Sequence, residues 1–183
     1  MRGNIQFPST LGGCPLVEIG DQFLSGCSDV TNVVIPSTVR RIGEYAFSDT
    51  RIKSIYLPKC LNEIGDNAFS FCNQILSITI PDNVSYLGWG TLSCEQMQYV
   101  YIGSSVSNVN YTCFQGCPSS LTIEVSKDNP YYDEGLFYSL DKKTVIATLR
   151  PNIGKQIQIK EGVTHIADYA FYKCSSLTSI ALP

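Results

Sequence analysis

The sequence contains a single histidine, His165, which is the first side chain to consider for acid–base chemistry. A catalytic histidine needs a partner that orients it, and no spacing around His165 supplies one. The sequence around His165 belongs to a short phrase that recurs along the chain. Where the other copies of this phrase align with His165, they carry Glu, Arg, Tyr or Asn. This variability is typical of an exposed position. We therefore interpret His165 as a surface residue and predict that the protein is not an enzyme.

Metal and cofactor sites are not predicted either. The 16 acidic residues are scattered without the spacing of a calcium loop, and neither an HExxH motif nor a pair of CxxC motifs occurs. The stretch Gly88-Trp89-Gly90 is too short for a phosphate-binding loop, which needs further glycines and a lysine or an acidic partner. We expect no catalytic residue, no cofactor and no bound metal.

Cysteine is the remaining reactive residue type. The chain has eight cysteines, and an even, dense set is common in exported, disulfide-bonded proteins. Cys27, Cys72 and Cys117, however, occupy one position of the repeat, two units apart. At a strand spacing of ~4.8 Å they should lie about 10 Å from one another, whereas a disulfide needs Cα atoms within about 7 Å. We therefore predict that these residues and Cys174, at the same position, are buried, reduced thiols.

Two further cysteines lie close to this position. Cys94 is one residue off it, in the unit between Cys72 and Cys117, so a bridge from Cys94 to either of them is an open alternative. Cys113 replaces the alanine of its unit and is expected to be buried.

The elements that would position these side chains follow from one repeated phrase, Ile-Gly-x-x-Ala-Phe. Its leading residues are separated by 23, 22, 23, 22 and 57 positions: Ile19, Ile42, Ile64, Leu87, Val109 and Ile166. The last gap equals one unit of 23 plus 34 further residues. A fixed period in the low twenties indicates a solenoid, in which stacked units bury their apolar faces against one another.

Two positions of the phrase have distinct structural roles. The second is mostly glycine, which indicates a tight turn or one with positive φ: Gly20, Gly43, Gly65 and Gly88. The sixth is large and apolar and predicts a stacked hydrophobic spine: Leu24, Phe47, Phe69, Leu92, Phe114 and Phe171. Between these positions we expect about one helical turn.

Each unit then ends in a strand. Alternating apolar residues predict eight parallel strands, at the pairs Ile5/Phe7, Val33/Ile35, Ile55/Leu57, Ile78/Ile80, Val100/Ile102, Ile123/Val125, Ile157/Ile159 and Ile180/Leu182. Proline follows several of them directly and ends the strand because it donates no hydrogen bond.

The segments AFSFCNQILSITIP and AFYKCSSLTSIALP resemble the BspA-like leucine-rich repeats of bacterial and protozoan surface proteins. The resemblance covers nearly the whole chain. It implies a leucine-rich-repeat solenoid that is right-handed, with a parallel β-sheet on its concave side and short helical or irregular turns on its convex side. It also implies a binding role without catalysis, often adhesion to host or matrix proteins, and a location at the cell surface or outside the cell.

The domain organisation predicted is a single solenoid over residues 1–183, with an atypical hairpin-bearing repeat at 126–155. Within the latter, 136–138 and 144–146 are strand-like and SLDKK between them is turn-like. Because the chain stops at Pro183 with nothing to cover the last strand, we expect a fragment of a longer array, or self-association through the uncapped C-terminal end.

Binding is expected on the concave sheet face, where the residue between two buried strand positions points outward. Tyrosine is enriched at binding hot spots, so the tyrosines are the expected anchors. The predicted protein-binding residues are Lys53, Tyr56, Thr79, Gln98, Tyr99, Tyr101 and Glu124.

Composition limits the remaining functions. A net charge of −3 without a basic run argues against nucleic acid, and no apolar stretch approaches the ~20 residues of a membrane helix. The chain carries no export signal, so a cytoplasmic location is not excluded. Two functions stay open: a module that binds proteins, such as matrix or host surface proteins, and a structural spacer or intracellular scaffold within a larger protein.

Overall fold

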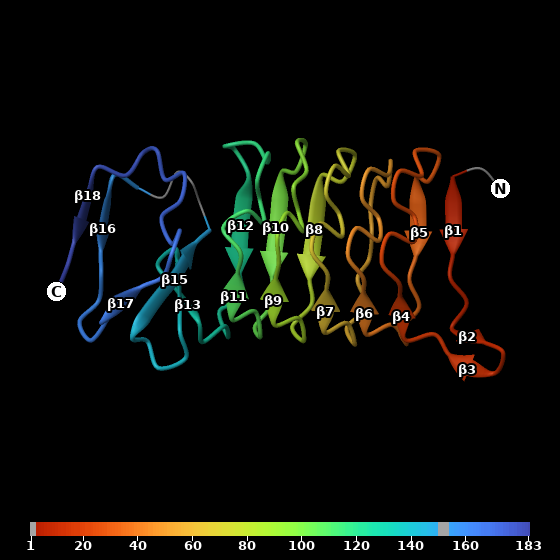
Figure 1. Cartoon of the computed structure of the whole chain (residues 1–183), viewed down its shortest axis with the longest axis horizontal. Helices are drawn as coiled ribbons and strands as arrows, with labels where there is room; N and C mark the ends of the chain where they lie inside the picture. Colours follow the sequence, from red (N-terminus) through yellow and green to blue (C-terminus); the bar gives the residue numbers. More distant parts are fainter. Residues whose placement is uncertain (1–2, 150–153) are drawn as a thin grey trace.

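The computed structural model describes residues 3–149 and 154–183 and forms an elongated parallel β-solenoid with the two chain ends at opposite ends (Figure 1). Seven of the eight predicted strands lie in one row along the solenoid, here called the main sheet, in three separately hydrogen-bonded groups. These are β1 (Asn4–Gln6), β5 (Asn32–Val34), β8 (Ser77–Ile80), β10 (Tyr99–Ile102), β12 (Thr122–Val125), β16 (Gln156–Gln158) and β18 (Ser179–Ala181). The eighth is reduced to a parallel bridge between Val33 and Ile55. All pairings in this sheet are parallel, as predicted.

A second row of parallel strands lies at the leading residues of the phrase, where no strand was predicted. It consists of β4 (Glu18–Ile19), β6 (Arg41–Ile42), β7 (Glu63–Ile64), β9 (Tyr86–Leu87), β11 (Asn108–Val109) and β17 (His165–Ile166). Ile19 pairs with Ile42, and Ile42 with Ile64. Two-residue strands leave too short an alternation to read from sequence, so only the stacking of the units makes them visible.

The expected helical turns are absent from the described residues, and hydrogen-bonded turns take their place. The amide of Leu24 donates to the carbonyl of Ala46 at 2.8 Å, and that of Phe47 to Ala68 at 2.9 Å. Bonds to the next unit therefore replace the i→i−4 bonds of a helix. Over residues 3–149 and 154–183, no helix is long and apolar enough to span a membrane.

Positive φ does not occur at the glycine position, which corrects the expectation for that column. Within the repeated turns, the left-handed residues lie at the third and seventh positions after the leading residue. They are Gln22, Tyr45, Asn67, Gly90 and Tyr169, and Gly26, Asp49, Phe71, Gly116 and Lys173. Gly43, Gly65 and Gly88 are instead required by close approach of the preceding turn. A Cβ on Gly65 would lie 2.6 Å from the backbone of Gly43 and Glu44.

The predicted hydrophobic spine is present and forms part of the hydrophobic core. Phe47 and Phe69 are fully buried and stacked, with ring centroids 5.4 Å apart, and Leu24 and Leu92 are buried on either side. Phe114 and Phe171, the last two residues of the spine, are only partly buried.

Residues 132–148 form the irregular part of the array. Strand β14 (Leu136–Tyr138) pairs antiparallel with β13 (Tyr132–Asp133) and with β15 (Thr144–Thr148). Strand β15 then pairs parallel with β17, with Val145 opposite Ile166. The hairpin thus supplies one strand to the second row. Residues 150–153 of the predicted 126–155 unit lie outside the described residues.

A second hairpin, which the sequence did not predict, lies near the N-terminus. Strand β2 (Thr10–Leu11) pairs antiparallel with β3 (Cys14–Pro15). Gly12 and Gly13 between them have positive φ values of 57° and 84°, which suit a two-residue hairpin turn.

Two corrections concern the cysteines. No disulfide joins any of the eight, so the open alternative of a bridge from Cys94 is wrong. Cys72 and Cys113 are buried as predicted, but Cys117 and Cys174 are only partly buried and Cys27 is exposed. Cys72 donates its thiol to the Phe47 carbonyl of the preceding turn at 3.0 Å. Cys27 belongs to the first turn and has no preceding turn to cover it.

Candidate protein-binding face

The outward side of the main sheet, here called the main face, presents one side chain from each strand in a single row. Thr79 lies opposite Tyr101, and Tyr101 opposite Glu124. Tyr56 occupies the same position one unit earlier, next to the bridge at Ile55. The intervening Ile78 and Val100 are buried, so strand alternation fixes which side chains face outward. Four of the seven predicted binding residues are therefore neighbours in one row.

Tyr99 joins this row through a hydrogen bond across the sheet. It lies two residues before Tyr101 on β10, and its hydroxyl donates to a carboxylate oxygen of Glu124 at 2.8 Å. This bond to Glu124 is the main reason that the pKa of Tyr99 is raised above its ordinary value. The bond orients the Tyr99 ring and occupies one carboxylate oxygen of Glu124.

Lys53 and Gln98 lie apart from the row of tyrosines, Gln98 directly before β10 and Lys53 two residues before the bridge at Ile55. The backbone amide of Lys53 donates to Thr31 at 3.1 Å and that of Gln98 to Leu76 at 2.8 Å, while both side chains are exposed. Lys53 lines a separate shallow hollow with Asn73, Gln74, Leu76 and Gln96. The structure therefore does not gather Lys53 with the tyrosines.

A hollow of about 670 Å³ lies on the main face between Tyr56 and Tyr101. The two tyrosines flank the short side chains of Ser77 and Thr79, which leaves room above the strand between them. Tyr56 is 70% exposed, so much of its surface is available for contact. This volume falls within the range of about 300–1,000 Å³ that is typical of ligand sites.

Three polar residues at one end of this hollow escaped the sequence analysis: Lys59, Asp82 and Asn83. They follow the strand-ending prolines Pro58 and Pro81, and this position is the signal that could have identified them. A carboxylate oxygen of Asp82 accepts the amide of Ser104 at 2.9 Å, and the Asn83 amide donates to the Lys59 carbonyl at 2.8 Å. These bonds fix the polar end of the hollow.

Reactive groups do not converge on this face. In the part of the chain that the structure describes, no group of three or more His, Cys, Asp or Glu side chains could hold a metal ion. His165 is exposed and contacts Thr164, with 2.8 Å between Nδ1 and the hydroxyl oxygen. The face thus combines phenol, hydroxyl and amide groups with the charged side chains of Lys59, Asp82 and Glu124.

A sequence model described as a BspA type leucine rich repeat region matches residues 4–143 and 152–183 in six copies. The chain belongs to this family. The recurring phrase, the strand that follows it and the solenoid that they form are therefore family features of a leucine-rich-repeat protein. No curated protein matches the sequence.

Solved leucine-rich-repeat proteins have a similar fold. A protein from Eubacterium ventriosum aligns with a TM-score of 0.66 and 21% identity over 97% of this chain and 49% of its own. The pneumococcal vaccine antigen PcpA aligns with a TM-score of 0.65 and 17% identity over 99% of this chain and 55% of its own. A protein from Bacteroides ovatus aligns with a TM-score of 0.64 and 20% identity over 99% of this chain and 61% of its own. This chain spans about half to three fifths of these relatives.

Proposed function

We propose that this leucine-rich-repeat chain is a non-catalytic module that binds another protein through its main face. The observation that carries the proposal is the hollow between Tyr56 and Tyr101, floored by Thr79, on an otherwise regular sheet. Tyrosine supplies large contact area with few rotatable bonds and a hydroxyl that can bond to a partner. A partner side chain in the hollow would contact Tyr56, Thr79 and Tyr101 of the main face.

The partner that we propose is a surface or matrix protein, so that the chain acts in adhesion. The fold supports this setting because bacterial leucine-rich-repeat proteins, one of them described as a vaccine antigen, align along nearly all of the chain. A location at the cell surface or outside the cell forms part of the same proposal. The other function, a structural spacer within a larger protein, predicts that the main face binds nothing.

The test is a binding assay with immobilised matrix and host surface proteins, using the wild type and a Tyr56→Ala/Tyr101→Ala double variant. We expect the double variant to bind at least about 30-fold more weakly, because truncating a hot-spot residue lowers the binding free energy by about 2 kcal/mol or more. A matched control is Tyr45→Ala, which removes an exposed tyrosine from the turn side. If the wild type binds no partner, the spacer function is the better explanation. If the double variant binds as well as the wild type, the partner does not use the hollow between Tyr56 and Tyr101, and the proposal is wrong.

A further inference from the structure

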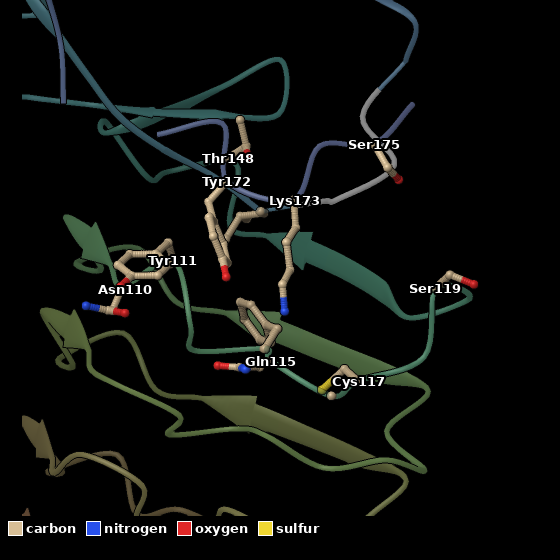
Figure 2. Close-up of a pocket in the computed structure, with 12 residues that line it drawn as sticks. Asn110, Tyr111, Gln115, Cys117, Ser119, Thr148, Tyr172, Lys173 and Ser175 are labelled. Atoms are coloured by element: carbon tan, nitrogen blue, oxygen red, sulfur yellow. The ribbon is translucent and has the colours of Figure 1, made fainter. Parts of the chain in front are cut away.

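A second cleft, of about 430 Å³, lies on the turn side of the solenoid and is lined by residues other than those of the main face. It opens between the turn at 110–117 and the turn at 172–175, with Thr148 and Leu149 at the end of β15 closing one side (Figure 2). After Val145 the sequence reads IATLRPNIG and lacks the Ala-Phe phrase that builds a regular turn. The hairpin unit thus separates two regular turns, and the cleft lies between them.

Tyr111 and Tyr172, which line the cleft, belong to a cluster of aromatic rings from three units that extends beside it. The ring of Tyr111 stacks on that of Tyr169 with centroids 4.5 Å apart, and it meets Tyr172 edge-on at 5.0 Å and Trp89 at 5.9 Å. Trp89, Tyr169 and Tyr172 are nevertheless 52%, 59% and 43% exposed. The rings hold one another in place while a large part of their apolar surface stays open to solvent.

Among the residues that line the cleft and that the structure describes, the polar groups are amides, hydroxyls, the Cys117 thiol and one cation, Lys173. Figure 2 shows Tyr172 and Lys173 pointing into the cleft towards the turn that carries Gln115. The ammonium of Lys173 lies 5.3 Å from the centroid of the Tyr172 ring, which holds the long side chain close to the aromatic surface. Among the described residues that line the cleft, none is Asp or Glu, although the chain as a whole has a net charge of −3.

This combination fits one chemical class of ligand. An aromatic ring offers an apolar platform for the C–H face of a sugar ring, while the Gln115 amide has both a donor and an acceptor for vicinal hydroxyls. A lysine in a site without carboxylates favours an anionic group on the ligand. We propose that the cleft binds an acidic saccharide, with the pyranose ring against Tyr172 and Tyr111 and its carboxylate at Lys173.

The adjoining surface indicates a ligand of more than one sugar. A neighbouring hollow of about 410 Å³ shares Gln115 and Gly116 with the cleft and is lined by Phe71 and Trp89. Each of the two hollows has an aromatic side chain, and they adjoin at Gln115, so we infer that each could take one sugar ring of the same ligand. An extended proline-rich peptide could also stack on aromatic side chains, but it carries no group that requires Lys173.

The experiment uses an array of immobilised glycans printed in matched pairs, with sialylated or uronate-bearing glycans beside counterparts that lack the carboxylate. A decaproline peptide is printed on the same surface. We expect the chain to bind acidic members and to bind their neutral counterparts at least ten-fold more weakly. Lys173→Met should abolish this preference, and Tyr172→Ala should lower binding to acidic glycans at least ten-fold.

Two matched variants control for general effects. Lys127→Met removes an exposed lysine, and Tyr45→Ala removes an exposed tyrosine whose left-handed position matches that of Tyr169, both outside the cleft. Both variants should bind the array as the wild type does, and circular dichroism confirms that all four variants are folded. The proposal is overturned if no glycan binds, if each neutral counterpart binds as well, if folded Lys173→Met retains the preference, or if decaproline is the ligand retained.

Discussion

At the scale of single residues, the glycine column shows how stacking constrains the chain. A Cβ at Gly43 would lie 2.5 Å from the backbone nitrogen of Asp21, and one at Gly88 would lie 1.9 Å from a carboxylate oxygen of Asp66. Gly20 has no atom within 4 Å of that point, since none of the described turns packs against it. The same residue type in the same column therefore has a steric role only where a preceding turn is present.

Alanine at the crowded position should destabilise the fold, while alanine at the open position should not. We expect Gly65→Ala to lower the free energy of unfolding by about 1–3 kcal/mol, because its Cβ would meet backbone atoms that have little room to move. Gly20→Ala, the matched control, should be neutral or stabilising by up to about 1 kcal/mol, since it only restricts the unfolded chain. Urea denaturation of both variants measures the difference. Equal stability of the two would contradict the steric explanation.

A row of thiols, two of them buried and one partly buried, is a second residue-scale feature. Cys72, Cys94 and Cys117 lie in consecutive turns, and each donates its thiol to a carbonyl of the preceding turn, at 3.0 Å, 3.1 Å and 3.0 Å. Cys94 makes the same kind of bond, although in the sequence it lies one residue away from the repeat position shared by Cys72 and Cys117. Burial raises the pKa of the Cys94 thiol far above its ordinary value, so the folded protein keeps it protonated.

This raised pKa predicts a loss of stability in alkali. Above pH ~8.5 the unfolded chain releases the Cys94 proton while the folded chain retains it, so the free energy of unfolding falls as pH rises. Cys94→Ala should make this fall shallower by up to about 1.4 kcal/mol per pH unit, the value for one proton. Cys60→Ala removes an exposed thiol and is the matched control. Urea denaturation between pH 7 and pH 10 tests it, and identical slopes in wild type and Cys94→Ala would refute it.

At the scale of elements, the spine couples neighbouring turns through ring stacking. Phe47 and Phe69 are fully buried and nearly parallel, with 12° between the ring planes. Each ring belongs to a turn whose amides bond to the next turn, as the Phe69 amide bonds to Thr91 at 3.1 Å. Side-chain packing and backbone bonding therefore act along the same axis.

Removing one ring of the spine should lower the free energy of unfolding far more than removing an exposed ring from the same turn. We expect Phe69→Ala to lower the free energy of unfolding by about 3–5 kcal/mol through lost burial and the cavity left behind. Phe71→Ala, two residues away and 59% exposed, should change it by less than about 1 kcal/mol. The midpoints of urea denaturation give both values. A cost below about 1 kcal/mol for Phe69→Ala would show that the spine does not stabilise the array.

At the scale of the whole molecule, stability should vary along the solenoid because each turn contacts only its neighbours. Leu61, Leu87 and Val100 in the middle are fully buried, whereas Ile166 and Ile180 in the last turn are 45% and 38% exposed. The middle turns are therefore packed on both sides, and the last turn is packed on one.

Hydrogen exchange should follow this gradient. We expect the amides of residues 42–109 to exchange most slowly, and those of 165–183 and of the first turn to exchange at least ten-fold faster through local opening. Mass spectrometry of peptide fragments after timed exchange measures the rates. Uniform protection along the chain would mean that the array opens only as one cooperative unit.

The sequence by itself determined the period, the spine, seven of the main strands and the outward row that carries Tyr56, Tyr101 and Glu124. These features follow from local patterns, since burial on one face fixes strand alternation and a repeated apolar residue fixes the spine. Only the tertiary structure decided the second row of strands, the left-handed positions and the exposure of Cys27. It also decided the meeting of Tyr111 with Tyr169, which lie far apart in the sequence on either side of the hairpin unit. Such contacts depend on which turn stacks on which, and a local pattern carries no information about that.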